Sequence, residues 1–398
     1  MQARSTAAAG FAVLAALATT APAAVADPPD RPAAEVADGR LVVSGTDGDD
    51  AIRLVLHRDE LRVAVHGRDH RIALAGLDRA TIAPGAGADQ VEVGDLGDAV
   101  FNGVEIDLGG DGAADAVTLT GGPGEDFASL LHFGATTFVL GLPTFSTVVN
   151  GGAEDALTLD AAGGDDQVSA QSYPADEPAL TLEGGEGGDL LAAGRGDDLV
   201  RGGPGDDFVT GGLGTDVARL GGGNDIFRWD PGEGSDAVAG QDGHDSLVFL
   251  GNGAAERFDV TAAGDGVRLT RDVGGIVMEL AGLERISGFA GAGADSVAIG
   301  DLSGTPMTGS DWGLGALDGA PDRISLDGTE GDDAFVVTGG VQNPAGTSTS
   351  AEVRGLDAAL LVTAIEHEDT LAIDGRGGRD TLDDSGLIPG GFGLSFIP

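Results

Sequence analysis

The stretch LVRGGPGDDFVTGGLGTDVARLGGGNDIF runs from Leu199 to Phe227 and is rich in glycine. In it a glycine pair, a further glycine, an aspartate and an apolar residue recur every nine residues. Glycine adopts positive φ and has no Cβ, so backbone carbonyls can converge in a tight turn. A fixed interval of this kind indicates a repeat architecture, because a flexible linker has no reason to keep aspartate and hydrophobe in phase.

The repeat extends on both sides of this stretch. Rows of nine begin at Gly184, Ala193, Gly202, Gly211 and Leu220, and after the insertion of Trp229 and Asp230 they resume at Pro231 and Gly240. The eighth position carries apolar side chains that we expect to point inward: Leu191, Val200, Val209, Ala218, Phe227, Val238 and Leu247. A dinucleotide-binding loop would need a third glycine at the seventh position, where the rows carry residues such as Leu190 and Phe208.

The rows resemble the RTX, or hemolysin-type, calcium-binding nonapeptide GGxGxDxUx, over Gly184 to Val248. The resemblance implies an all-β fold with a parallel β-roll, or β-solenoid. In such a roll each row is a turn followed by a short strand, and two rows make one coil. Turns eighteen residues apart then stack on the same edge. We therefore expect Asp189, Asp207 and Asp225 on one edge, and Asp198 and Asp216, joined by Asp236, on the other.

Stacked carboxylates repel one another unless a cation lies between them. Carboxylate and carbonyl oxygens are hard ligands that suit calcium. The sequence therefore predicts several Ca²⁺ ions between successive turns, bound by the sixth-position aspartates and by turn glycines. The expected aspartates are Asp189, Asp198, Asp207, Asp216, Asp225, Asp236 and Asp245, and the expected glycines are Gly185, Gly187, Gly194, Gly196, Gly203, Gly205, Gly212, Gly214, Gly221 and Gly223.

The composition agrees with a cation as the principal partner. The net charge is -45 over 398 residues, and such a chain repels nucleic acid and anionic membranes. Cysteine is absent, which excludes disulfides, thiol catalysis and cysteine-based zinc sites. Aromatic residues are only 4%, so small aliphatic side chains must fill most of the core.

The first residues predict export. Arg4, an apolar stretch from Ala7 to Leu17, and the small residues before Asp27 form the three parts of a secretory signal peptide. We expect a signal peptide over 1–26, a linker over 27–39, and a secreted, extracellular protein with no membrane span. The apolar ending GLSFIP leaves a C-terminal export signal as the alternative route.

Two flanks surround the roll and resemble each other. GLDRATIAPGAGADQVEVGDL (Gly76 to Leu96) matches GLERISGFAGAGADSVAIGDL (Gly282 to Leu302), and further pairs follow in the same order. Alternating segments such as IRLVLH and VRLT predict strands. We therefore expect a β-rich module over 40–182, the calcium-binding roll over 183–250 and a related β-rich module over 251–398.

Isolated sixth-position aspartates also occur in the flanks. Many of their rows have no neighbour at the right spacing, so calcium binding and a purely structural glycine–aspartate turn remain alternatives. These residues are Asp50, Asp89, Asp126, Asp166, Asp295, Asp333 and Asp380.

Catalytic motifs are missing from the sequence. It contains neither HExxH nor G-x-S-x-G, and all six histidines are expected at the surface. We therefore expect a calcium-binding protein and not an enzyme. Two alternatives stay open: a secreted hydrolase with an unrecognised carboxylate site, and an adhesin or extracellular matrix protein whose solenoid surface binds a glycan or another surface.

Overall fold

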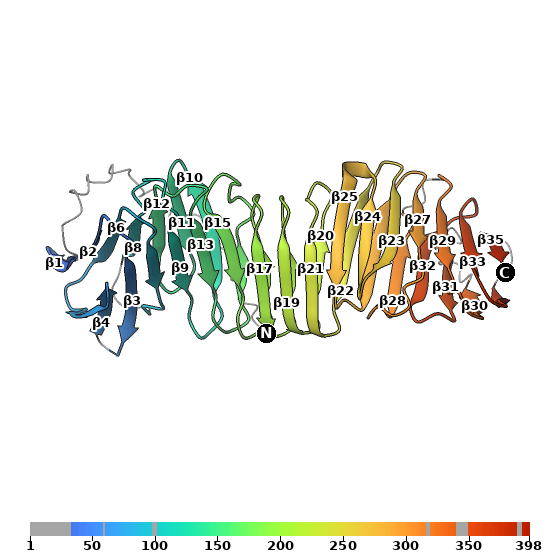
Figure 1. The fold of residues 1–398 in the computed structure, drawn as a ribbon, viewed down its shortest axis with the longest axis horizontal. Helices are drawn as coiled ribbons and strands as arrows, with labels where there is room; N and C mark the ends of the chain where they lie inside the picture. The colour runs from blue at the N-terminus through green and yellow to red at the C-terminus, as the bar shows by residue number, and fades with distance from the viewer. Residues whose placement is uncertain (1–32, 59, 98–101, 316–318, 340–348, 388–391) are drawn as a thin grey trace, which may run out of the picture.

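The computed structural model describes residues 33–398 except 59, 98–101, 316–318, 340–348 and 388–391. The signal peptide expected over 1–26 therefore lies outside the described residues. Within them the chain forms one elongated stack of β-strands (Figure 1). A single short 3₁₀ turn, η1 (Val273–Gly275), interrupts the described strands. No helix in this part of the chain has the length and apolarity to cross a bilayer.

The strands form two long sheets. Sheet A runs, in spatial order, β1 (Ala33–Ala37), β2 (Arg40–Thr46), β6 (Arg79–Gly85), β8 (Val104–Asp107), β12 (Ser146–Val149), β11 (Thr136–Leu140), β10 (Phe127–Phe133), β14 (Gln167–Ser169), β16 (Leu190–Ala192), β18 (Phe208–Thr210), β20 (Ile226–Trp229), β22 (Ser246–Asn252), β26 (Arg285–Gly291), β28 (Gly309–Gly313), β32 (Ala359–Ile365), β31 (Thr349–Arg354), β30 (Ala334–Gly339) and β34 (Thr381–Leu387).

Sheet B lies opposite and is built in the same way. Its spatial order is β5 (Arg68–Ala73), β4 (Glu60–Val65), β3 (Ala51–His57), β7 (Gln90–Val93), β9 (Ala116–Thr120), β13 (Ala156–Asp160), β15 (Ala179–Glu183), β17 (Leu199–Pro204), β19 (Val217–Gly223), β21 (Ala237–Gly243), β25 (Ile276–Ala281), β24 (Gly266–Arg271), β23 (Arg257–Ala263), β27 (Ser296–Ile299), β29 (Arg323–Asp327), β33 (Thr370–Asp374) and β35 (Gly393–Ile397).

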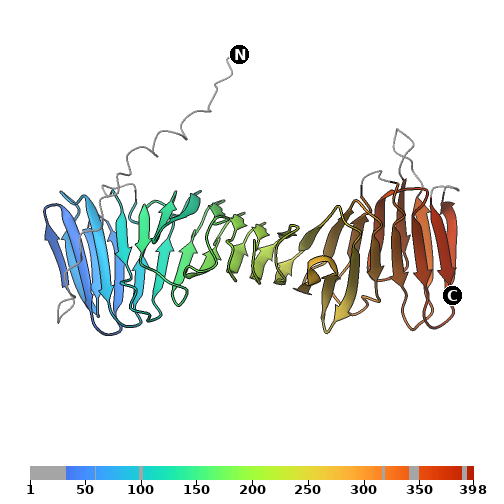
Figure 2. The ribbon, with the colours of Figure 1, turned by 90° about the horizontal axis from the view of Figure 1, so that it is seen from above.

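The register of the central coils confirms the predicted β-roll. Leu190 pairs with Phe208, and Phe208 pairs with Ile226, so parallel neighbours in one sheet lie eighteen residues apart. Ile226 pairs with Ser246, because the insertion of Trp229 and Asp230 lengthens that coil by two residues. All seven eighth-position side chains are buried, with at most 2% exposure, as expected. β16 and β18 contain three residues each, and Figure 2 shows this part as the narrow waist of the rod.

The flanks share one topology. The pairings β2–β6, β3–β7 and β10–β14 in the first flank recur as β22–β26, β23–β27 and β30–β34 in the second. Each flank also carries antiparallel excursions: β3–β4–β5 and β10–β11–β12 correspond to β23–β24–β25 and β30–β31–β32. Two related β-rich modules therefore enclose the roll, while the expected domain boundaries stay a prediction because both sheets run through them.

One expected linker segment is a strand. Residues 27–39 were predicted as a linker, but Ala33–Ala37 form β1, which pairs antiparallel with β2. The cause is the exposed edge of β2, whose backbone groups need hydrogen-bond partners.

Four aromatic side chains form a column where the roll meets the second flank. Trp229 stacks on Phe249 with ring centroids 4.3 Å apart. Phe258 lies edge-on to Phe249 at 6.1 Å, and Trp312 lies 5.3 Å from Phe258. All four side chains are at most 1% exposed. The core of the narrow roll is aliphatic apart from Phe227, and this aromatic column fills the wider coil that follows it.

Candidate metal centre

The sixth-position aspartates form two ladders along the edges of the roll. The backbone N–H of Asp189 donates to Oδ1 of Asp207 at 2.8 Å, and that of Asp207 donates to Oδ1 of Asp225 at 2.8 Å. On the other edge Asp198 donates to Asp216 at 2.8 Å, and Asp216 donates to Asp236 at 3.0 Å. The structure therefore brings these residues together on the predicted edges.

The second carboxylate oxygen of most ladder residues has no partner. Oδ2 is buried and accepts no hydrogen bond from any described residue in six of the seven predicted aspartates: Asp189, Asp207, Asp216, Asp225, Asp236 and Asp245. These side chains are at most 2% exposed. A buried, unpaired carboxylate oxygen is strongly unfavourable, so each of these atoms calls for a hydrogen-bond donor or a cation.

The turn conformation explains why Oδ2 stays bare. In these rows the second turn residue has positive φ, as for Gly185 (φ 102), Gly203 (φ 118) and Gln241 (φ 84). Where the second residue lacks positive φ, its N–H caps the carboxylate instead. Gly194 is such a residue, and it donates to Oδ2 of Asp198 at 2.7 Å. The sign of φ at one position thus separates two kinds of turn.

Asp198 and its glycines therefore differ from the other predicted ligands. Gly194 and Gly196 lack positive φ, unlike the remaining glycines that the sequence predicted as ligands. Their turn stacks on the irregular loop around Tyr173 and Ala175 and not on a glycine turn. Asp198, predicted as a ligand like the other six aspartates, thus has its Oδ2 occupied by a backbone N–H.

The stacked glycines bring carbonyl oxygens against the next turn. A Cβ on Gly203 would lie 2.1 Å from the carbonyl oxygen of Gly185, and one on Gly205 would lie 1.9 Å from that of Gly187. The equivalent positions Gly221 and Gly223 would meet the oxygens of Gly203 and Gly205 at 2.0 Å each. Only glycine allows this approach, which lines each stacked turn with oxygen.

The donor set fits a hard cation that takes most of its ligands from the backbone. Among the described residues, no three His, Asp or Glu side chains converge on one point. Every turn of the roll except that of Asp198 instead supplies one bare carboxylate oxygen beside closely packed carbonyl groups. An all-oxygen set of this kind suits calcium.

The electrostatics of the ladder also favour a bound cation. Burial, with a smaller contribution from neighbouring aspartates, raises the pKa of Asp207 to about 7 and that of Asp216 to about 8. The N–H donated by the preceding aspartate opposes the shift. The charged carboxylates are thus poorly solvated where they lie, and a cation between the turns would offset this.

A second, exposed ladder runs beside the first, and the repeat pattern did not predict it. The carboxylate of Asp206 accepts the backbone N–H of Asn224 at 2.7 Å, and that of Asp197 accepts the N–H of Thr215 at 2.7 Å. These residues occupy the fifth row position, where polar residues recur. They hold adjacent turns in register from the solvent side.

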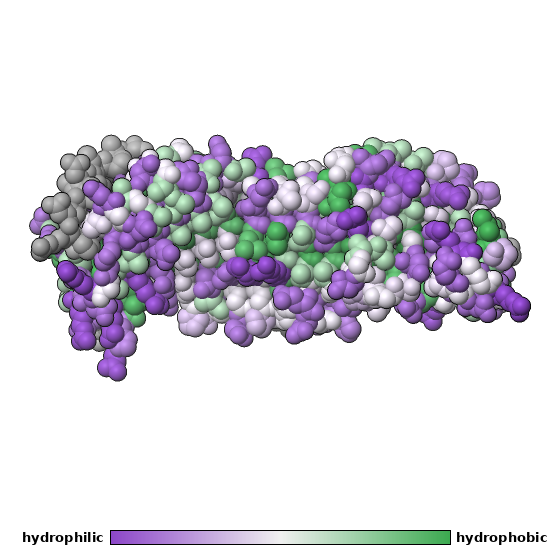
Figure 3. Space-filling view, viewed as in Figure 1, coloured by the Kyte–Doolittle hydropathy of each residue, from purple (hydrophilic) through white to green (hydrophobic). Residues whose placement is uncertain are grey.

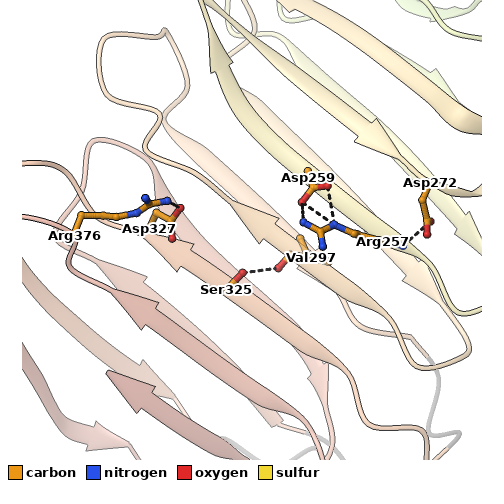
Figure 4. A network of polar contacts seen from close by, with 7 residues as sticks. All are labelled: Arg257, Asp259, Asp272, Val297, Ser325, Asp327 and Arg376. Atoms are coloured by element: carbon orange, nitrogen blue, oxygen red, sulfur yellow. Dashed lines mark hydrogen bonds and ion pairs between the residues drawn. The ribbon is translucent and has the colours of Figure 1, made fainter. Parts of the chain in front are cut away.

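Two arginines of the second flank pair with aspartates outside the sixth row position. In the second flank Arg257 contacts Asp259, and Arg376 contacts Asp327 although its backbone belongs to the turn before Asp380 (Figure 4). The expectation of six surface histidines is wrong for His132. Its side chain is 11% exposed and pairs with Glu177 at 3.3 Å, because the β10–β11 excursion packs it against the loop that carries Glu177.

Fold and turns together define a parallel β-solenoid of nonapeptide rows with oxygen-lined turns. Comparison with known families agrees: residues 183–218 match the RTX calcium-binding nonapeptide repeat in four copies. The chain thus carries RTX calcium-binding repeats, and these indicate a calcium-binding repeat protein.

Whole-chain comparisons add little. No curated protein matches the chain. Among solved structures, the extracellular lipase LipA from Serratia marcescens is similar over 63% of this chain and 38% of the lipase, with 17% identity and a TM-score of 0.18. The match thus spans well under half of the lipase, and we draw neither fold nor activity from it.

Proposed function

We propose that this protein is a secreted, non-enzymatic calcium-binding protein whose central roll folds on Ca²⁺ held between stacked turns. The observation that carries the proposal is the row of buried, unpartnered Oδ2 atoms along the ladders. Secretion is supported by the leader-like sequence of residues 1–26 and by the RTX repeats, which are typical of secreted bacterial proteins.

Calcium supplies the positive charge that the ladders need. The sixth-position aspartates would hold it through Oδ2, and the glycine carbonyls of neighbouring turns would complete its oxygen shell. Extracellular modules bind calcium with Kd on the order of 10⁻⁴ to 10⁻³ M. At about 1 mM calcium and the tighter end of that range, each site that exists only in the folded roll adds roughly 1.4 kcal/mol. Several such sites would match the roughly 5 kcal/mol at the low end of domain stability.

A calcium titration followed by circular dichroism tests this function. Calcium-free mature protein should gain β signal cooperatively as calcium is added, because each turn serves two neighbouring sites. A chelator should reverse the change. A β signal unchanged by calcium or chelator would overturn the proposal, and hydrolysis of an ester, peptide or glycan by the loaded protein would overturn its non-enzymatic part.

A further inference from the structure

Bare carboxylate oxygens also occur in the first flank, outside the residues that match the repeat family. Oδ2 of Asp89 and of Asp166 is buried and accepts no hydrogen bond from any residue the structure describes. The two side chains are 1% and 2% exposed. The central roll shows the same environment for Asp207.

Asp89 and Asp166 each follow another aspartate in a ladder of hydrogen bonds. In that preceding aspartate Oδ2 accepts a backbone N–H and is therefore called capped. Oδ2 of Asp50 accepts the backbone N–H of Thr46 at 2.6 Å and its hydroxyl at 2.8 Å. The N–H of Asp50 then donates to Oδ1 of Asp89 at 2.7 Å, which leaves Oδ2 of Asp89 bare.

The second ladder of the flank repeats this arrangement. Oδ2 of Asp126 accepts the N–H of Gly122 at 2.8 Å, and the N–H of Asp126 donates to Oδ1 of Asp166 at 2.6 Å. In both ladders of the flank a capped carboxylate is thus followed by a bare one.

The turn backbone follows the same rule as in the roll. The second turn residue has positive φ before both bare carboxylates, with Gly85 at 114° and Ala162 at 74°. Thr46 and Gly122, before the capped ones, do not have positive φ. An alanine held in the left-handed region is strained by about 1–3 kcal/mol, so the surrounding stack must impose this conformation.

Carbonyl oxygens line these turns as well. A Cβ on Gly85 would lie 1.9 Å from the carbonyl oxygen of Thr46. Cβ atoms on Gly185 and Gly187 would lie 2.2 Å and 1.8 Å from the carbonyl oxygens of Ala162 and Gly164. The turn that ends in Asp166 therefore stacks on the first turn of the roll as the roll's own turns stack on each other.

We propose that the turns ending in Asp89 and Asp166 each bind a calcium ion, whereas those ending in Asp50 and Asp126 are structural. The inference rests on the proposed calcium-binding function and extends it to two sites in the first flank. The Asp166 site lengthens the metal-bound stack by one turn before residue 183. The Asp89 site lies apart from it, on the edge of sheet B.

The test counts calcium ions bound to the full mature chain by calorimetry and elemental analysis. The variants are Asp89→Asn and Asp166→Asn, with Asp50→Asn and Asp126→Asn as matched controls. At Asp89 and Asp166, asparagine keeps Oδ1 for the N–H of the preceding ladder residue and replaces Oδ2 by an amide nitrogen that cannot bind a cation. We expect one ion fewer in each of the first two, two fewer in their double variant, and the parental count in both controls.

The outcomes separate this inference from the function on which it rests. If the parent binds calcium and both Asn variants keep its full count, the flank sites do not exist while the calcium-binding roll stands. If the parent binds none, the proposed function itself fails. Should a variant not fold, anomalous scattering from crystals of the parent grown with calcium decides: peaks beside Asp89 and Asp166 support the inference, and bare turns there overturn it.

Discussion

The backbone N–H of Asp207 donates to Oδ1 of Asp225, one coil further along the chain, at 2.8 Å. In six of the seven ladder aspartates of the roll, one oxygen thereby joins two coils and the other is left for a cation. Asparagine could accept the same hydrogen bond but would not supply the negative charge. This division of roles accounts for aspartate at the sixth position of those six rows, whereas Oδ2 of Asp198 accepts the N–H of Gly194.

Calcium should fold the roll where magnesium does not. Magnesium demands a small octahedral site and holds its waters tightly, whereas carbonyl-rich stacked turns are roomier. We expect the far-ultraviolet dichroism of calcium-free protein to change at millimolar calcium and to stay flat at equal magnesium. Equal responses to the two ions would contradict the site geometry.

Replacing a central ladder aspartate should weaken calcium binding more than replacing a terminal one. Asp207 lies between Asp189 and Asp225, so Asp207→Ala disturbs two adjacent sites. We expect its calcium midpoint for folding to rise several-fold, and that of Asp380→Ala in the last coils to move less. The measurement is a dichroism titration of both variants beside the parent, and equal midpoints for all three would count against the ladder as the metal site.

A methyl group between two stacked turns should be poorly tolerated. Gly203 has a φ of 118°, and a Cβ there would lie 2.1 Å from the carbonyl oxygen of Gly185. Gly203→Ala should lose at least the roughly 1–3 kcal/mol of strained backbone, as measured by chemical unfolding in excess calcium. Gly222→Ala is the matched control, since its nearest neighbour would be 3.9 Å away. Similar stability of the two variants would contradict the close stacking of the turns.

The sequence predicted the roll well because its signals are local. The resemblance of the nine-residue rows to the RTX repeat implies two rows per coil, and every eighth-position side chain is buried as expected. The two kinds of turn were not predictable, since Gly194 and Gly203 occupy the same row position and differ only in φ. That difference arises from the preceding coil, where Tyr173 lies under one turn and Gly185 under the other.

The flanks show the same limit of local information. Alternating apolar residues predicted their strands, but a period of two does not say which strand pairs with which. The antiparallel excursions such as β23–β24–β25 depend on non-local pairing. Their recurrence in both flanks agrees with the matching segments that the sequence already showed.

Glu233, in the turn after β20, should make stability depend on pH. Burial raises the pKa of Glu233 to about 7. The hydrogen bond from the N–H of Asp230 opposes this shift, and so does the positive charge of Arg228. The negative charges of Asp230 and Asp236 add to it. Because this pKa is higher than in the unfolded chain, the proton's contribution to stability is complete below about pH 4.5 and is lost as pH rises through 7.

Glu233→Gln isolates this contribution. The variant keeps an acceptor for the Asp230 N–H and stays neutral at every pH, so its stability advantage over the parent should grow from pH 5 to pH 8. The slope for one proton is at most about 1.4 kcal/mol per pH unit and is reduced here because the side chain is half-buried. Unfolding by urea in excess calcium measures it, and parallel pH profiles for parent and variant would refute the assignment.

The buried ion pair at the junction of roll and second flank should be the most sensitive polar contact of the core. Arg271 and Glu256 are each 3% exposed, Nε of Arg271 donates to Oε1 at 2.9 Å, and the guanidinium lies 5.3 Å from the ring centroid of Trp229. Arg271→Met leaves the carboxylate charged and buried, so it should lose about 3–5 kcal/mol in chemical unfolding. Adding Glu256→Gln removes that charge and should recover much of the loss.

Arg268→Met is the control, because it breaks only the exposed pair with Glu279, and it should lose less than about 1 kcal/mol. If the two single arginine variants were equally stable, burial would not govern the energetics of this junction.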